Sequence, residues 1–441
     1  MDPVLVFLLG FATVFIVGIA GEIVFERTGV PDVVWLMIVG LLLGPGLGIV
    51  RRADLLAIGP YVGAVTLVVV LFEGGSKLRL SEVSQALPRS SLLAVSGFVL
   101  NVAVLAAASM GAAALGILPA EWTWLHGTIL GAILGGSSSI VIMPALAKAG
   151  LGPKLGSLVS VESALTDVLC VVITIACIHI AASGSVEPMA AATILGKSFG
   201  IGLGAGLVVG MLWLLFLRAL KDSPHAYAAT LSILLVLAVV VQLLEGNAAL
   251  AILAAAVVVG NAPALADSVG LQKDARLSAG VQDTHSHLTF IVKSFFFTFI
   301  GAMLGPPWDL VTVGVVFALL LFVTRIPAVL LSTAGSGMTG AERRAVTVMF
   351  PRGMAAGVLA LMPFGAGVPG TEQLPVVVFA CVLFTILLFA IGLPIAKHGL
   401  RPGAAPEEQA RSAGLPTEPS PIAAALPPTP SPPGDPERPL A

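Results

Sequence analysis

The sequence predicts an all-α polytopic membrane protein. Its mean hydropathy is +1.03, and 57% of its residues are hydrophobic while only 10% are charged, which lies outside the range of soluble domains. Apolar runs of about 20 residues recur almost to the C-terminus, and a helix of that length spans a bilayer core of about 30 Å. The runs leave no room between them for a soluble catalytic domain.

Apolar runs separated by glycine, proline and charged residues are expected to be about 13 transmembrane helices. The first run lacks the basic n-region of a secretory signal, so we expect it to be retained. The runs cover residues 4–25, 31–50, 57–75, 90–114, 123–147, 156–182, 191–218, 226–244, 247–265, 286–304, 310–333, 345–366 and 374–397.

The charges between the runs predict the orientation. With the N-terminus outside, the outer connections hold only Arg51 and Arg52 as basic residues, as the positive-inside rule requires. An odd number of crossings then puts the C-terminus in the cytoplasm. The basic residues expected inside are Arg27, Lys77, Arg79, Arg89, Lys148, Lys154, Arg218, Lys221, Lys273, Arg276, Arg343, Arg344, Lys397 and Arg401.

Two segments are polar. Residues 402–441 are rich in proline, alanine, serine and glutamate without apolar periodicity, so they are expected to form a disordered Pro-rich cytoplasmic tail. The tail is too short for a nucleotide-binding regulatory domain and contains no dinucleotide-binding glycine pattern. The connection from about Asn261 to His287 could include an interfacial helix.

Residues 1–401 are predicted to form one transmembrane domain, with repeats at about 4–182 and 226–397 and a linker helix at about 191–218. The fifth run contains the segment GGSSS at 135–139, and the twelfth contains the segment PRG at 351–353. These breaks occupy corresponding positions in two six-helix halves. Paired broken helices indicate an inverted-repeat transporter whose breaks cross at the membrane midplane, beside its site.

The stretch SVESALTDVLCVV, residues 160–172, places two acids inside the sixth run. A carboxylate in hydrocarbon is costly and is a functional candidate by default. Successive helical residues rotate by about 100°, so Glu162 and Asp167 lie about 140° apart and cannot both face one small site. One acid is therefore expected to face an ion path and the other to pair with a buried cation. Ser163 shares a face with Asp167, and Thr166 shares one with Glu162.

Asp167 is the predicted proton- and cation-binding residue, because a buried carboxyl can exchange a proton and its ionised form offers oxygen ligands to an alkali cation. The alternative is a structural aspartate permanently paired with Lys293. The GGSSS segment would add the hydroxyls of Ser137, Ser138 and Ser139 and free backbone carbonyls, which suit Na⁺ or K⁺. Close helix packing is the alternative explanation for that segment.

Three cations at apparent membrane depth are candidate charge partners. Arg352 is expected to form a structural ion pair with Glu162, since a guanidinium matches a carboxylate bidentately. Glu162 could instead be a second titrating ligand. Lys293 could neutralise Asp167 when no cation is bound, or extend to the interface. Arg325 is expected to form a structural pair or to contact the end of a broken helix.

Other polar groups lie near the ends of runs. Glu73, Lys197 and Glu245 are expected to be interfacial. His285 and His287 could form a pH sensor or an ordinary solvated pair.

The three cysteines, Cys170, Cys177 and Cys381, lack metal-ligand spacing and are expected to pack inside helices. No basic stripe with interleaved aromatic residues predicts nucleic-acid binding.

Several segments, taken in order, carry a family resemblance. They are ERTGVPDVVWLMIVGLLLGPGLG, LFEGGSKLRL, GGSSSIVIMPALAKAG, ESALTD, KSFFFTFIGAMLG and PRGMAAGVLAL. Together they resemble the monovalent cation:proton antiporter superfamily, the bacterial sodium/proton or potassium/proton exchangers, over about residues 5–397.

The resemblance implies roles for individual residues. Asp167 falls on the family's essential acid, which binds the cation and the proton in turn, and Thr166 falls on the Asn or Asp before it. A neutral Thr166 is similar to the Asn-Asp relatives that exchange equal charge, whereas Lys293 matches a cation of the Asp-Asp relatives. The resemblance also puts Glu162 and Arg352 on a pair of the Asn-Asp branch.

The resemblance further implies the setting. The family's acid in the fifth helix is missing here, so Ser137, Ser138, Ser139 and Thr166 would help to coordinate the alkali cation held by Asp167. A homodimer in the bacterial inner membrane, moving a six-helix core against a dimer domain, is expected.

The expected function is secondary antiport of Na⁺ or K⁺ against protons by alternating access, with both ions competing for Asp167 and with no cofactor. One alternative is a ligand-gated K⁺ efflux system, which usually carries a nucleotide-binding domain. Another is a non-transporting membrane sensor or assembly protein that retains the fold. An enzyme is not expected, because no nucleophile and base occur at matched depth.

Overall fold

Apolar helices make up the regular structure of the described part of the chain. The computed structural model describes residues 3–76, 80–151, 153–183, 188–219, 225–262, Leu265 and 279–397, all within the unit Met1–Leu400. The predicted tail at 402–441 and most of the connection between residues 261 and 287 lie outside these residues. Within them, the prediction of an all-helical protein is confirmed.

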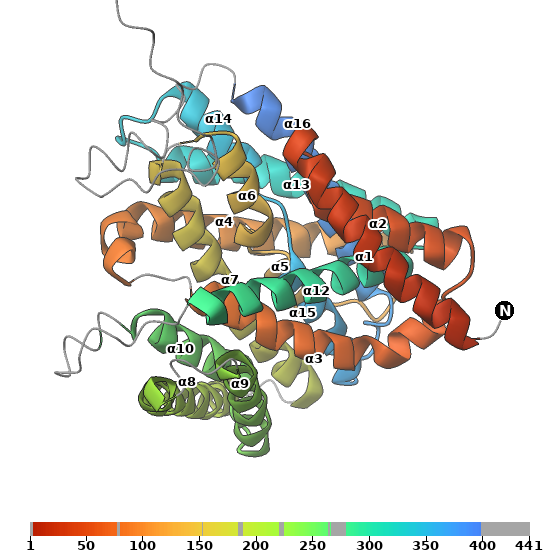
Figure 1. Ribbon diagram of the computed structural model, residues 1–441. Coiled ribbons are helices and arrows are strands. Elements are labelled where there is room, and N and C mark those ends of the chain that lie inside the picture. Colours follow the sequence, from red (N-terminus) through yellow and green to blue (C-terminus); the bar gives the residue numbers. More distant parts are fainter. Residues whose placement is uncertain are drawn as a thin grey trace, which may run out of the picture. The chain divides into compact units, whose positions relative to one another are not determined.

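The described helices are labelled and coloured in chain order in Figure 1. They are α1 (Pro3–Thr28), α2 (Asp32–Leu41) continued by the π-helical turn η1 (Leu42–Gly46), α3 (Arg52–Ser76), α4 (Leu80–Ala114), α5 (Trp124–Ile133), α6 (Ser139–Lys148), α7 (Pro153–Ser183), α8 (Pro188–Ala219), α9 (Ala226–Leu243), α10 (Ala248–Gly260), α12 (Ala279–Met303), α13 (Trp308–Ser332), α14 (Gly340–Val348), α15 (Met354–Gly365) and α16 (Leu374–Ala396).

The chain is a multi-pass membrane protein. Among the residues searched, 9 helices are long and apolar enough to cross a bilayer, and shorter apolar helices include α5, α6, α10 and α15. Each predicted apolar run overlaps one of these helices or a consecutive pair of elements. The number of crossings remains a prediction, because several runs contain short or broken helices.

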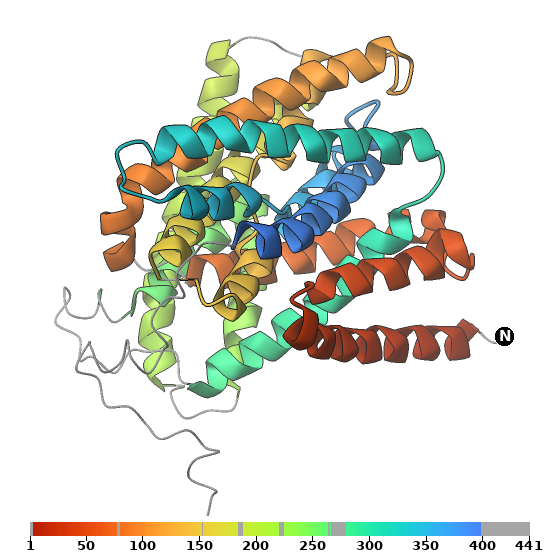
Figure 2. The same ribbon diagram turned by 90° about the horizontal axis from the view of Figure 1, so that it is seen from above.

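The helices pack in two groups. We call α1–α3, α8–α10 and α12 the α3 bundle, and α4–α7 and α13–α16 the α7 bundle, because helices contact mainly members of their own group. In Figure 1, α8, α9 and α10 lie together, away from α4, α13 and α16. Figure 2 shows α4 and α13 side by side in orange and teal, far from α1 in dark red. The two groups meet mainly where α15 packs against α3.

A pair of glycines in α8 tests the packing inside the α3 bundle. A Cβ added at Gly206 would collide with the carbonyl of Ala251 and lie 2.8 Å from Ala254 Cβ, whereas one at Gly204 would meet nothing within 4 Å. We expect Gly206→Ala to destabilise the protein by about 1–3 kcal/mol through overpacking. Gly204→Ala should be neutral or slightly stabilising, because alanine favours helix. Thermal unfolding in detergent measures both, and equal unfolding temperatures would contradict the close approach of α8 and α10.

Candidate functional site

Two helices are interrupted where the sequence predicts breaks. α5 ends at Ile133 and α6 begins at Ser139, while α14 ends at Val348 and α15 begins at Met354. Glycine is a poor helix former, and Pro351 has no N–H to donate to a preceding turn. The predicted breaks at 135–139 and 351–353 are therefore confirmed.

The two breaks lie against each other and form hydrogen bonds. The backbone N–H of Ser138 donates to Pro351 O at 2.9 Å, and the guanidinium of Arg352 donates to Gly136 O. A Cβ added at Gly353 would lie 2.6 Å from Ser138 Cβ, so the absence of a side chain allows this approach. Four half-helices therefore point their ends at one small volume.

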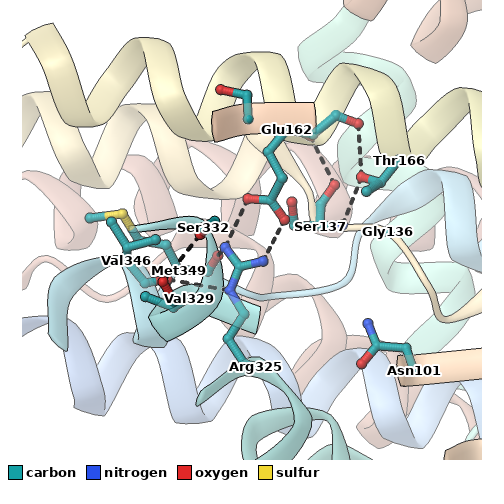
Figure 3. A network of polar contacts seen from close by, with 12 residues as sticks. Asn101, Gly136, Ser137, Glu162, Thr166, Arg325, Val329, Ser332, Val346 and Met349 are labelled. Atoms are coloured by element: carbon teal, nitrogen blue, oxygen red, sulfur yellow. Dashed lines mark hydrogen bonds and ion pairs between the residues drawn. The ribbon is translucent and has the colours of Figure 1, made fainter. Parts of the chain in front are cut away.

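Buried polar side chains satisfy the carbonyls that the breaks leave open. At the end of α5, Gly135 O accepts from Asn101 Nδ2 at 3.1 Å. At the end of α14, Arg325 donates to Met349 O at 3.0 Å and to Val346 O at 3.4 Å (Figure 3). Helix C-termini carry partial negative charge, so a guanidinium stabilises them. The prediction that Arg325 contacts a broken-helix end is confirmed.

Glu162 has a different partner from the one predicted. Its carboxylate faces the fork of Arg325, with Oε2 2.8 Å from Nη2 and a second contact between Oε1 and Nη1 (Figure 3). The two side chains are only 2% and 6% exposed. The predicted pair of Glu162 with Arg352 is therefore wrong, because Arg325 reaches the acid from α13 while Arg352 is turned toward Gly136.

Lys293 also has a different partner from the one predicted. Its Nζ lies 2.6 Å from Asp32 Oδ2 on α2, inside the α3 bundle, and both side chains are 15% exposed. The predicted neutralising contact with Asp167 is not observed, and neither are the two alternatives, a permanent pair with Asp167 and an extension to the interface. Asp32 was overlooked, although an acid directly after Pro31 at the start of an apolar run is a visible signal.

Asp167 lines a small cavity between α3, α7 and the two breaks. The side chain is half-buried, and it makes no hydrogen bond or ion pair with any residue that the structure describes. The cavity offers about 20 Å³ to the centre of a water-sized sphere, which is room for roughly one water or ion. Gly74 of α3 forms the opposite wall, and a Cβ there would lie 4.0 Å from Asp167 Oδ2. Met354–Ala356 at the start of α15 also line the cavity.

The serines of the first break line the cavity, and two hydroxyls of α7 support them. Ser137, Ser138 and Ser139 line the cavity. Ser163 Oγ, behind them on α7, donates to Ser137 O at 2.8 Å and accepts from the Ser139 N–H at 2.9 Å. Thr166 Oγ1 donates to Ser163 O at 3.0 Å and accepts from the Ser137 N–H at 3.4 Å. Ser137 Oγ itself is buried and lacks a hydrogen-bond partner within the described ranges.

Glu73 was predicted to be interfacial, and this is wrong. It is buried in α3, where it pairs with His285 of α12 and accepts from Thr289 Oγ1 at 3.4 Å. His285 Nδ1 shares a 2.9 Å hydrogen bond with Tyr227 OH, whereas His287 is exposed. The two histidines are therefore not a solvated pair. Glu73 lies in the same turn of α3 as Gly74, which lines the cavity with Asp167.

A second, larger cavity lies farther along α3, α7 and α15. Its volume is about 670 Å³, and it extends from Pro60 on α3 to Ala366 after α15. Glu245 lines it and forms an exposed ion pair with Lys197 at 2.8 Å. The place of these two residues at the membrane interface stays a prediction. The hydrogen bond and charge of Lys197 hold the pKa of Glu245 below its ordinary value.

Two supporting residues were not predicted. Asn101 accepts a 2.6 Å hydrogen bond from Thr324 while it donates to the first break, and Thr385 accepts one from the Arg352 N–H at 3.1 Å. Each is an isolated polar residue in an otherwise apolar run, and such residues tend to face a helix break or another polar group.

Comparisons with known proteins agree with this geometry. A family model described as "Sodium/hydrogen exchanger, transmembrane" matches residues 11–396. The chain is similar to the K(+)/H(+) antiporter NhaP of Alkalimonas amylolytica, with 26% identity over 90% of this chain and 67% of the relative. It is also similar to the K(+)/H(+) antiporter NhaP2 of Shewanella baltica, with 26% identity over 85% of this chain and 63% of the relative. The chain thus spans about two thirds of the length of these relatives.

A solved structure shows the same fold. The sodium proton antiporter MjNhaP1 from Methanocaldococcus jannaschii superposes with a TM-score of 0.73 at 18% identity, covering 90% of this chain and 99% of that one.

Proposed function

The chain belongs to the sodium/hydrogen exchanger family, and from this premise we propose that it exchanges Na⁺ or K⁺ for protons by secondary active antiport. One observation carries the proposal. A carboxylate without a protein partner among the described residues, that of Asp167, lines a cavity for about one ion beside two helix breaks that bond to each other. The curated relatives are named K⁺/H⁺ antiporters and the solved one a sodium/proton antiporter, so the proposal includes both cations.

In this proposal, proton and cation compete for Asp167. The ionised carboxylate holds the alkali cation, and the oxygens of Ser137, Ser138 and Ser139 supply neutral ligands. Thr166 and Ser163 keep the break in place through their hydrogen bonds. An ionised, empty carboxylate is costly to carry through hydrocarbon, whereas a protonated or cation-loaded one is not. The α7 bundle therefore moves against the α3 bundle only when Asp167 is occupied.

The charge inventory favours an equal exchange of charge. Glu162 forms an ion pair with Arg325, and Lys293 forms one with Asp32. Neither Glu162 nor Lys293 is therefore expected to gain or lose a partner during the transport cycle. Asp167 then exchanges one cation for one proton, and Thr166 beside it adds no charge.

The proposed setting follows the charges of the connections. We place the N-terminus outside and the C-terminus in the cytoplasm of a bacterial inner membrane, with the chain working as a homodimer. In this orientation the 670 Å³ cavity, between the first half of α3 and the last half of α15, lies on the outer side of Asp167 and provides an access route. No cofactor is required.

Purified protein in vesicles tests the proposal. We expect Na⁺ or K⁺ gradients to drive proton movement, detected with a pH-sensitive dye. We also expect net flux to stop when the proton concentration ratio across the membrane equals the cation concentration ratio, at any membrane potential. One uncompensated charge would shift that balance about 50-fold at 100 mV. A balance point that moves with the potential would contradict equal exchange. Proton flux that ignores both cations, or no flux at all, would contradict antiport and favour a sensor that retains the fold.

A further inference from the structure

The cavity beside Asp167 is lined by sulfur-containing residues as well as by residues with side-chain oxygens. We propose that it binds soft monovalent cations, with silver(I) as the probe and Cys170 as the ligand that forms the metal–sulfur bond. This inference rests on the proposed function, because it puts silver in the same cavity as the transported cation. Cys170 and Met354 both line the cavity and are 3% and 2% exposed. Thiolate and thioether sulfurs select soft ions, whereas alkali cations prefer oxygen.

The thiol lies next to the carboxylate and the first break. Cys170 follows Asp167 by three residues on α7, so the two share a face of the helix. A Cβ added at Gly136 would lie 2.9 Å from Cys170 Sγ, so the missing side chain lets the sulfur reach the unwound segment.

A second observation indicates that the cavity is built for an occupant. Ser137 lines it and is 2% exposed, and the Ser137 hydroxyl has no hydrogen-bond partner in the described part of the chain. Buried polar atoms are nearly always paired, so an unpaired one calls for a bound ion or water. Carboxylate, thiol and hydroxyl thus border one space that holds roughly one ion.

The other two cysteines provide matched controls. Cys177 lies on the same face of α7 two turns later and is 7% exposed, and Cys381 on α16 is fully buried. Neither lines the cavity beside Asp167 or the larger one. Cys170 is therefore the cysteine expected to bind a cation that enters the cavity.

The binding step is a simple exchange of a proton for silver. The S–H bond of Cys170 breaks, an Ag–S bond forms, and the released proton goes to the Asp167 carboxylate or to water. Charge is conserved, and no oxidant or reductant is needed. Because the sulfur bond is stronger than the oxygen contacts of an alkali cation, silver should remain in the cavity and stop exchange.

Silver binding is measured first without transport. Full-length protein in detergent and chloride-free nitrate buffer is titrated with silver nitrate and examined by native mass spectrometry. We expect one bound silver ion in the unchanged protein and in the Cys177→Ser and Cys381→Ser variants, and its loss in Cys170→Ser. Retention of silver by Cys170→Ser, or its loss in either control variant, would overturn the proposal.

Transport then separates this inference from the proposed function. In vesicles, we expect silver to stop cation-driven proton flux in the unchanged protein and in Cys177→Ser. In Cys170→Ser, the flux with silver should be close to the flux of the same variant without silver. Flux that continues with silver bound would overturn the inference while antiport stands. Silver bound at Cys170 in a protein without any cation-driven flux would overturn antiport and leave the silver site intact.

Discussion

Asp167→Asn is expected to abolish cation-driven proton flux, with a fall of about 100-fold or more, which corresponds to about 3 kcal/mol. Asparagine keeps the shape of the side chain, but it cannot hold a proton at neutral pH or offer a negative charge to Na⁺ or K⁺. The variant should nevertheless fold, because Asp167 makes no hydrogen bond or ion pair with any described residue. Removing an unpaired charge from a half-buried position should leave the unfolding temperature unchanged or raise it.

The control for this experiment is a carboxylate outside the cavity. Asp54→Asn removes an exposed acid that pairs with Arg51 at 3.0 Å, and its flux should match that of the unchanged protein. Both variants are compared at equal protein level in the same vesicles. If Asp167→Asn retains cation-driven proton movement, the carboxylate is not the exchange site, and the cavity must serve another purpose.

The features that local chemistry determines could be predicted from the sequence. Apolar runs of bilayer length predict the helices, and the segments at 135–139 and 351–353 predict the breaks. Glycine and proline disfavour helix wherever they occur, so their effect does not depend on distant parts of the chain. The helical period also shows correctly that Glu162 and Asp167 serve different surroundings, since one is paired and the other lines the cavity.

The choice of charge partner could not be predicted. Glu162 must meet a cation, but helical periodicity gives only the face of α7 on which it lies, and Arg325 and Arg352 are both long enough to reach it. The packing of α13 and the end of α14 decide the pair in favour of Arg325. Lys293 illustrates the same limit, because its partner Asp32 is more than 250 residues away in sequence. Such contacts depend on how the bundles pack.

Arg325→Met is expected to be the most destabilising single substitution near the breaks. It leaves the buried carboxylate of Glu162 without its guanidinium, and it removes the donor for Val346 O and Met349 O. Breaking a buried ion pair by removing one partner typically costs about 3–5 kcal/mol, because the remaining charge stays buried. Thermal unfolding in detergent should show a large fall in unfolding temperature. Arg51→Met, which breaks an exposed pair, should cost about 1 kcal/mol or less.

A double-mutant cycle distinguishes the two possible partners of Glu162. Because Glu162→Gln removes the stranded charge, the double variant with Arg325→Met should be less destabilised than the sum of the single variants, with a coupling of about 1–3 kcal/mol. The corresponding cycle with Arg352→Met should show much weaker coupling, since Arg352 donates to Gly136 O and not to the acid. Strong coupling to Arg352 and none to Arg325 would mean that the ion pair changes partner when the breaks rearrange. The acid would then be coupled by charge to the second break and not to α13.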